Sequence, residues 1–223
     1  NEKDGAFKSI TSPILKPTSW DQTMVLPFAP ADGAPALMTG VSNYESGSAE
    51  LPSIMSYDFA GRKVSEIRTG EMSSTGPMCQ ADLDGDGDLD LFVGGRIVPG
   101  QYPSPANSVL LENRESKFVV AHEWPKLGMV QGAVFSDITG DSRPELILSL
   151  HWDSLRVYSW EKGSWKAREI TRELGLEPHR GWWNGVATGD FNNDGRMDIA
   201  ATNWGLNWRN KPTPSNPIRV YHG

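Results

Sequence analysis

The chain has little cysteine, no long apolar run and no excess of positive charge, and each shortage excludes a class of protein. Cys79 is the single cysteine in 223 residues, so an intrachain disulfide is impossible. No segment approaches the roughly 18 consecutive apolar residues of a membrane-spanning helix, so no membrane span is expected. The formal net charge of −7 repels phosphate backbones, which excludes nucleic acid as the expected partner.

Catalytic signatures are equally scarce. The four histidines are scattered, and neither an HExxH nor a GxSxG motif occurs. Cys79 has no evident partner for nucleophilic activation, so we expect a buried thiol. The sequence therefore favours a protein that is not an enzyme.

What the sequence does contain is a repeat of about 54 residues. Four copies of one segment begin at positions 28, 82, 137 and 190, so successive copies are 54, 55 and 53 residues apart. Each copy follows a short β-prone run and precedes an apolar strand, and the later copies continue into an alternating strand and a fourth strand. Helical periodicity is scarce, and only residues 171–176 suit one short helix.

Four short strands in each unit of this length are typical of a propeller blade. We therefore predict an all-β protein, a β-propeller of four-stranded blades at approximately residues 24–70, 76–121, 131–171 and 184–223. Residues 1–10 would form the outer strand of a neighbouring blade or of the closing blade. Either the chain closes a ring of four blades or it is an excerpt of a larger ring. We favour the excerpt, because Gly223 stands where a hairpin turn should begin.

Two of the repeated segments have the composition of a calcium loop. Ca²⁺ takes six to eight oxygen ligands, and a nine-residue Asp-rich turn offers side-chain oxygens at positions 1, 3, 5 and 9 and a carbonyl at position 7. Glycine at position 6 permits the sharp reversal. The alternative, a solvated turn that binds nothing, would leave five acidic groups in nine residues without compensation. The candidate ligands are Asp82, Asp84, Asp86, Asp88 and Asp90 in one copy, and Asp190, Asn192, Asp194, Arg196 and Asp198 in the other, with Asp88 and Arg196 offering carbonyls.

The other two copies are degraded. Residues 137–145 keep four candidate ligands but have Ser142 where glycine is expected, so calcium there is left open. The first copy has Phe28 and Ala36 at ligand positions and is predicted to be metal-free. Bound calcium would stabilise the native state by mass action, so we expect a structural rather than a catalytic ion.

The segments 82–95 and 190–202 resemble FG-GAP (VCBS-type) repeats. Residues 94–103, 108–113, 181–185 and 203–207 are most similar to the bacterial relatives of cartilage acidic protein, the ASPIC/UnbV-type proteins. The resemblance covers residues 76–223 well and the first 75 poorly. It implies a propeller, calcium, an extracellular, cell-surface or periplasmic location, and adhesion or recognition within a larger chain or complex. It does not imply an enzyme.

Nine tryptophans are many for a chain of this size. Trp182, Trp183, Trp204 and Trp208 gather around the fourth copy, either as an aromatic platform for sugar rings or as packing between blades. Trp152, Trp160 and Trp165 are expected in the core. We therefore predict a calcium-binding recognition, adhesion or scaffold module with a protein or glycan ligand at one propeller face. The alternative is a carbohydrate-binding or carbohydrate-active propeller, such as a lyase or hydrolase.

Overall fold

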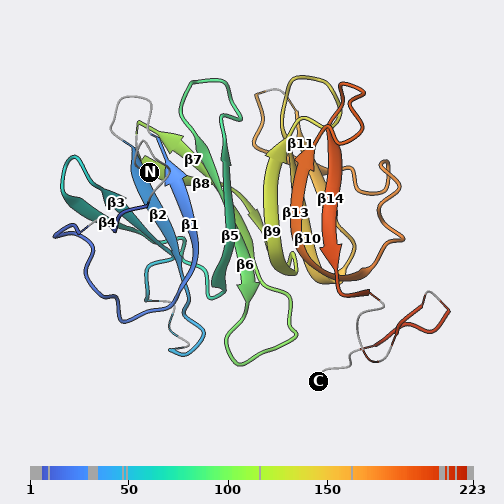
Figure 1. Ribbon diagram of the computed structural model, residues 1–223, viewed down its shortest axis with the longest axis horizontal. Helices are drawn as coiled ribbons and strands as arrows, with labels where there is room; N and C mark the ends of the chain where they lie inside the picture. Colours follow the sequence, from blue (N-terminus) through green and yellow to red (C-terminus); the bar gives the residue numbers. More distant parts are fainter. Residues whose placement is uncertain are drawn as a thin grey trace.

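The computed structural model is an all-β protein (Figure 1). It describes residues 7–9, 11–29, 35–46, 48, 50–115, 117–161, 163–205, 209, 211–213 and 215–219. The strands are β1 (Gln22–Phe28), β2 (Ala36–Val41), β3 (Ile54–Asp58), β4 (Lys63–Ile67), β5 (Ser74–Ala81), β6 (Asp90–Ile97), β7 (Ser108–Arg114), β8 (Lys117–Trp124), β9 (Met129–Ser136), β10 (Glu145–Asp153), β11 (Arg156–Trp160), β12 (Ala167–Glu169), β13 (Gly181–Gly189) and β14 (Asp198–Asn203). Within the described residues, no helix is long and apolar enough to cross a membrane.

The strands assemble into antiparallel sheets in which chain neighbours pair. Strands β1 to β4 form one four-stranded sheet in sequence order, and β5 to β8 form a second. Strands β9 to β12 also pair consecutively, and β10 additionally meets the start of β13 where His151 lies opposite Trp182. Strand β13 then pairs with β14. This order follows from the short turns between alternating strands, which leave each strand beside its predecessor.

The first strand of each unit faces the corresponding strand of the next unit. Strands β1, β5, β9 and β13 lie in this order across the molecule (Figure 1), and each contacts the next. The core fills the spaces between adjacent sheets. One cluster joins Phe92 and Trp124 of the second sheet to Leu148 and Tyr158 of the third, and another joins Met38 and its neighbours to the second sheet.

The Asp-rich loops all lie at one end of these sheets. Residues 82–90, 137–145 and 190–198 connect β5 to β6, β9 to β10 and β13 to β14, and Figure 1 shows these turns together at the top. The segment that follows β6 and the one that follows β14 leave from the opposite end. The fold therefore separates two faces, one with the Asp loops and one with longer connections.

Three expectations differ from the structure or fall outside it. Residues 171–175 form hydrogen-bonded turns rather than a helix, because Leu174 bonds to Ile170 but no continuous ladder follows. Residues 7–9 and Ile218 form no strand, and the rest of the predicted strands at the two ends lies outside the described residues. Within the described part of residues 184–223, the strands are β13 and β14.

Candidate functional site

The loop 82–90 is organised by its first carboxylate. The Asp82 side chain accepts hydrogen bonds from the backbone N–H groups of Gly85 at 2.7 Å and Gly87 at 3.1 Å. Both glycines have positive φ, 83° and 91°, so the chain reverses twice within three residues. The turn thereby brings alternate side chains to one side.

The reversal gathers three carboxylates. Asp82, Asp84 and Asp86 each offer an oxygen within 4.8 Å of the others, and all three are exposed. Partial burial raises the pKa of Asp84, and the charges of Asp86 and Asp82 act in the same direction. Such a group of clustered carboxylates suits a divalent cation that prefers oxygen ligands.

The ninth residue, Asp90, anchors this loop to the sheet. It is 1% exposed, and its carboxylate accepts N–H groups from Leu83 at 3.0 Å and from Asn113 of β7 at 3.0 Å. Burial raises the pKa of Asp90 to about 6, and the charges of Asp84 and Asp86 contribute. The buried carboxylate therefore links the loop to β7, and it lies near the negative charges of Asp84 and Asp86.

Asn113 was not anticipated by the sequence. Its side chain is 1% exposed, and neither amide atom has a hydrogen-bond partner, although its backbone N–H donates to Asp90. The one signal in the sequence is an amide two residues after the apolar run 109–111.

The loop 190–198 repeats the same scaffold. Asp190 accepts N–H groups from Asp194 at 3.0 Å and Gly195 at 2.9 Å, and Asp198 accepts the N–H of Phe191 at 3.0 Å. Asn193 and Gly195 have the positive φ angles, 61° and 83°. The sequence prediction located the glycine of this pair but not its partner two residues earlier.

The remaining predicted ligands of the two loops occupy matching places. Asp86 accepts the N–H of Asp88 at 2.8 Å, and Asp194 accepts that of Arg196 at 2.9 Å, so the position-7 residues are held in equivalent turns. Asn192 takes the place of Asp84 and donates its amide to Asp194 at 3.2 Å. This loop therefore has one negative charge fewer at its centre.

The loop 137–145 has the same shape but different chemistry. Asp137 accepts the N–H groups of Gly140 and Ser142, and Ser142 takes the positive φ of 66° that glycine takes elsewhere. Asp141 forms an ion pair with Arg143 at 2.7 Å, and this guanidinium lowers the pKa of Asp141. The Glu145 carboxylate accepts two backbone N–H groups and the Thr139 hydroxyl. This loop therefore differs from loop 82–90 in the guanidinium that pairs with Asp141 and in the hydroxyl that donates to Glu145.

An aromatic cluster lies at the opposite face. The Trp182 and Trp204 rings stack with centroids 4.9 Å apart and planes 8° apart, and Trp152 meets Trp182 edge-on at 4.5 Å. The Trp152 indole N–H donates to the Tyr102 hydroxyl at 3.1 Å. Trp204 is 42% exposed and Tyr102 is 48% exposed. Residues from three units of the repeat therefore form one partly exposed aromatic surface.

The structure confirms some of the predictions for the tryptophans and differs from others. The structure brings together Trp182 and Trp204, whereas the Trp183 indole N–H donates to the His179 carbonyl and takes no part in the stack. Trp208 lies outside the described residues. Trp160 and Trp165 pack against the core as expected. Trp152, which has a positive φ of 66° at the end of β10, joins the partly exposed cluster instead. Cys79 is buried as predicted, and burial raises the pKa of its thiol.

Comparison with known proteins supports the repeat and the fold. Residues 137–201 match the model of the FG-GAP-like repeat. No curated protein matches the chain. Among solved structures, the chain is similar to the exotype rhamnogalacturonan lyase YesX, with 14% sequence identity and a TM-score of 0.53 over 86% of this chain. The chain spans 41% of the length of that lyase, and at this identity the likeness concerns the fold alone.

Proposed function

We propose that the repeats are blades of a β-propeller whose Asp loops 82–90 and 190–198 bind calcium, and that this propeller is a recognition or scaffold module of an exported protein. Loop 137–145 takes no ion in this proposal. The relatives that we propose as nearest are the ASPIC/UnbV-type proteins, and the module belongs to a larger chain or complex.

One observation carries the proposal. Three carboxylates of loop 82–90 place oxygens within 4.8 Å of one another on a turn that a buried fourth carboxylate fixes to the sheet. Without a cation this arrangement concentrates negative charge, and with calcium the same oxygens become ligands. The FG-GAP-like match over residues 137–201 includes the second such loop.

The location and the absence of catalysis belong to the same proposal. Calcium loops of moderate affinity fill where calcium is millimolar, which is outside the cytosol. We assign the loops a stabilising role, because each closes a turn between the first two strands of a unit and all lie on one face. The opposite face, with its longer connections, is where a protein or glycan partner would bind.

Chelation of calcium tests this function. We expect EDTA to lower the melting temperature in comparison with 2 mM calcium, because each ion bound only by the native state adds about 2 kcal/mol when its Kd is about 10⁻⁴ M. Differential scanning calorimetry measures the shift, and magnesium at the same concentration serves as the control. Equal melting temperatures in EDTA and in calcium would refute the proposal.

Carbohydrate binding is a second candidate, favoured by the aromatic cluster. Stacked and partly exposed indoles such as Trp182 and Trp204 offer flat apolar surface to a sugar ring, and Tyr102 adds a hydroxyl. YesX is a rhamnogalacturonan lyase, and a carbohydrate-active role is the corresponding alternative for this chain.

Substitution of Trp204 by alanine discriminates between platform and packing. If Trp204 is a platform residue, we expect Trp204→Ala to lose binding to an array of neutral pyranose oligosaccharides while its melting temperature changes little. Trp183→Ala is the matched control, because Trp183 is the adjacent tryptophan outside the stack. The cluster would be assigned to packing if Trp204→Ala lowered the melting temperature strongly while the protein that remained folded still bound the array as the native chain does.

A further inference from the structure

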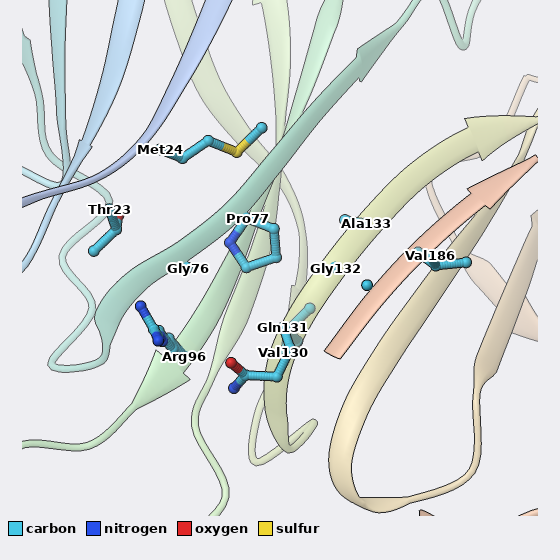
Figure 2. A pocket seen from close by; sticks show the side chains of 11 residues that line it. Thr23, Met24, Gly76, Pro77, Arg96, Val130, Gln131, Gly132, Ala133 and Val186 are labelled. Atoms are coloured by element: carbon cyan, nitrogen blue, oxygen red, sulfur yellow. The ribbon is translucent and has the colours of Figure 1, made fainter. Parts of the chain in front are cut away.

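A cavity of about 370 Å³ opens where the first strands of all four units converge. Its lining comes from β1, β5, β9 and β13, with one side chain from β6, and Figure 2 shows these strands around it. The lining residues are Thr23, Met24, Gly76, Pro77, Arg96, Val130, Gln131, Gly132, Ala133, Gly185 and Val186. The cavity is separate from the Asp loops, which lie at the far ends of these strands.

Glycines bring the strands this close together. A Cβ on Gly132 would lie 3.0 Å from the Val186 nitrogen, and one on Gly76 would lie 3.0 Å from the Gly94 carbonyl oxygen and 3.1 Å from the Arg96 Cβ. The backbones therefore form much of the wall. The missing side chain at Gly76 also lets Arg96 of β6 extend past β5 to the cavity.

Arg96 is the single charged residue among the described residues of this lining. Figure 2 shows its guanidinium and the Gln131 amide on the same side of the cavity. Five other arginines hold a guanidinium nitrogen 2.5 to 2.8 Å from a carboxylate, namely Arg68, Arg114, Arg143, Arg156 and Arg168. Arg96 has no such ion pair within the described part of the chain, although the protein carries a net charge of −7.

His151 of β10 lies within electrostatic range of Arg96. Burial lowers the pKa of His151, and the charge of Arg96 acts in the same direction. His151 shares a 3.3 Å hydrogen bond with the Asn184 amide oxygen. Its ring lies 4.4 Å from that of Trp182, so the vicinity of Arg96 extends to the aromatic cluster.

We propose that this cavity binds a carboxylate, which Arg96 engages through its planar fork of N–H donors while the Gln131 amide donates beside it. The inference deepens the proposed recognition function by naming the ligand chemistry, and it does not depend on calcium. A guanidinium is suited to bidentate carboxylate recognition, and a lysine would offer only a point charge. The carboxylate belongs to a sugar acid or to an aliphatic acid.

Titration of the calcium-loaded chain with glucuronate, glucose and succinate tests the site. Glucuronate and glucose differ at one carbon, which is a carboxylate in the first and a hydroxymethyl group in the second. We expect glucuronate, succinate or both to shift the backbone amide resonances of Gly76, Gly132 and Gly185 in ¹⁵N-HSQC spectra, and glucose to shift them far less. Glucuronate alone identifies a sugar acid as the ligand class, and succinate alone identifies an aliphatic acid.

Variants of Arg96 complete the test. Arg96→Gln is expected to weaken binding of the active acid by about tenfold or more, and Arg96→Lys to recover part of the affinity. Arg172→Gln is the control for net charge, because its side chain is 90% exposed beyond the outermost strand of its sheet. Equal affinity of Arg96→Gln and the native chain, equal binding of glucose, or no binding of either acid would overturn the inference. The calcium-dependent melting shift of Arg96→Gln should be unchanged, so failure here is distinguishable from failure of the calcium proposal.

Discussion

Replacing Asp82 with alanine is expected to abolish calcium binding at loop 82–90 and with it about 2 kcal/mol of calcium-dependent stability at 2 mM calcium, for a Kd of about 10⁻⁴ M. Asp82 has two roles, because its carboxylate accepts the N–H groups of Gly85 and Gly87 and also stands first among the three clustered acids. A simple loss of stability would therefore not separate the turn from the ion.

The chain provides a matched control in loop 137–145. Asp137 accepts the N–H groups of Gly140, Asp141 and Ser142, so Asp137→Ala removes at least as many hydrogen bonds as Asp82→Ala. Its loop already pairs Asp141 with Arg143 and is proposed to bind no ion. Melting in EDTA should fall for both variants, whereas the stabilisation gained on adding calcium should shrink for Asp82→Ala alone. An equal calcium response in Asp82→Ala and the native chain contradicts the assignment of this loop.

Phe92→Ala is expected to destabilise the fold most, by about 3 to 5 kcal/mol, because a fully buried aromatic side chain leaves a cavity. Phe92 is 0% exposed and meets Trp124 edge-on at 5.7 Å. Both belong to the cluster that joins the second sheet to the third, so the loss weakens the contact between units as well as one sheet.

Urea denaturation measures this effect, with Phe191→Ala as the control. Phe191 is 64% exposed in loop 190–198, and its replacement should change the free energy of unfolding by no more than about 0.5 kcal/mol. Similar losses in the two variants would show that the sheets do not share a continuous core. A loss of free energy of unfolding in Phe92→Ala alone would support the view that adjacent units stabilise one another.

The strand pattern of the central units was predictable because their residues alternate clearly and the repeat fixes the register. The apolar strands expected directly after the copies that begin at positions 82 and 137 are β6 and β10. The helix predicted at residues 171–176 is absent, although the residues there are compatible with one. The backbone N–H of Ile170, just before this segment, donates to the Val157 carbonyl of β11 and so fixes the chain to the sheet. Local composition did not contain that tertiary constraint.

The loop chemistry was readable only in part. Spacing located the three Asp-rich turns, and Ser142 of loop 137–145 takes the positive φ that glycine takes at the same place in the other two. The decisive change there is Arg143, whose guanidinium reaches back to Asp141, and no spacing rule shows that contact. Likewise, Tyr102 and Trp152 are 50 residues apart and join one cluster only through folding. The cavity with Arg96 depends on glycines of separate strands and was invisible in the sequence.

An anomalous difference map from crystals grown in millimolar calcium tests the account at its centre. We expect one peak among the oxygens of Asp82, Asp84 and Asp86, a second in loop 190–198, and none beside the Asp141 and Arg143 ion pair. Empty density at both predicted loops, or a peak in loop 137–145 alone, would contradict it.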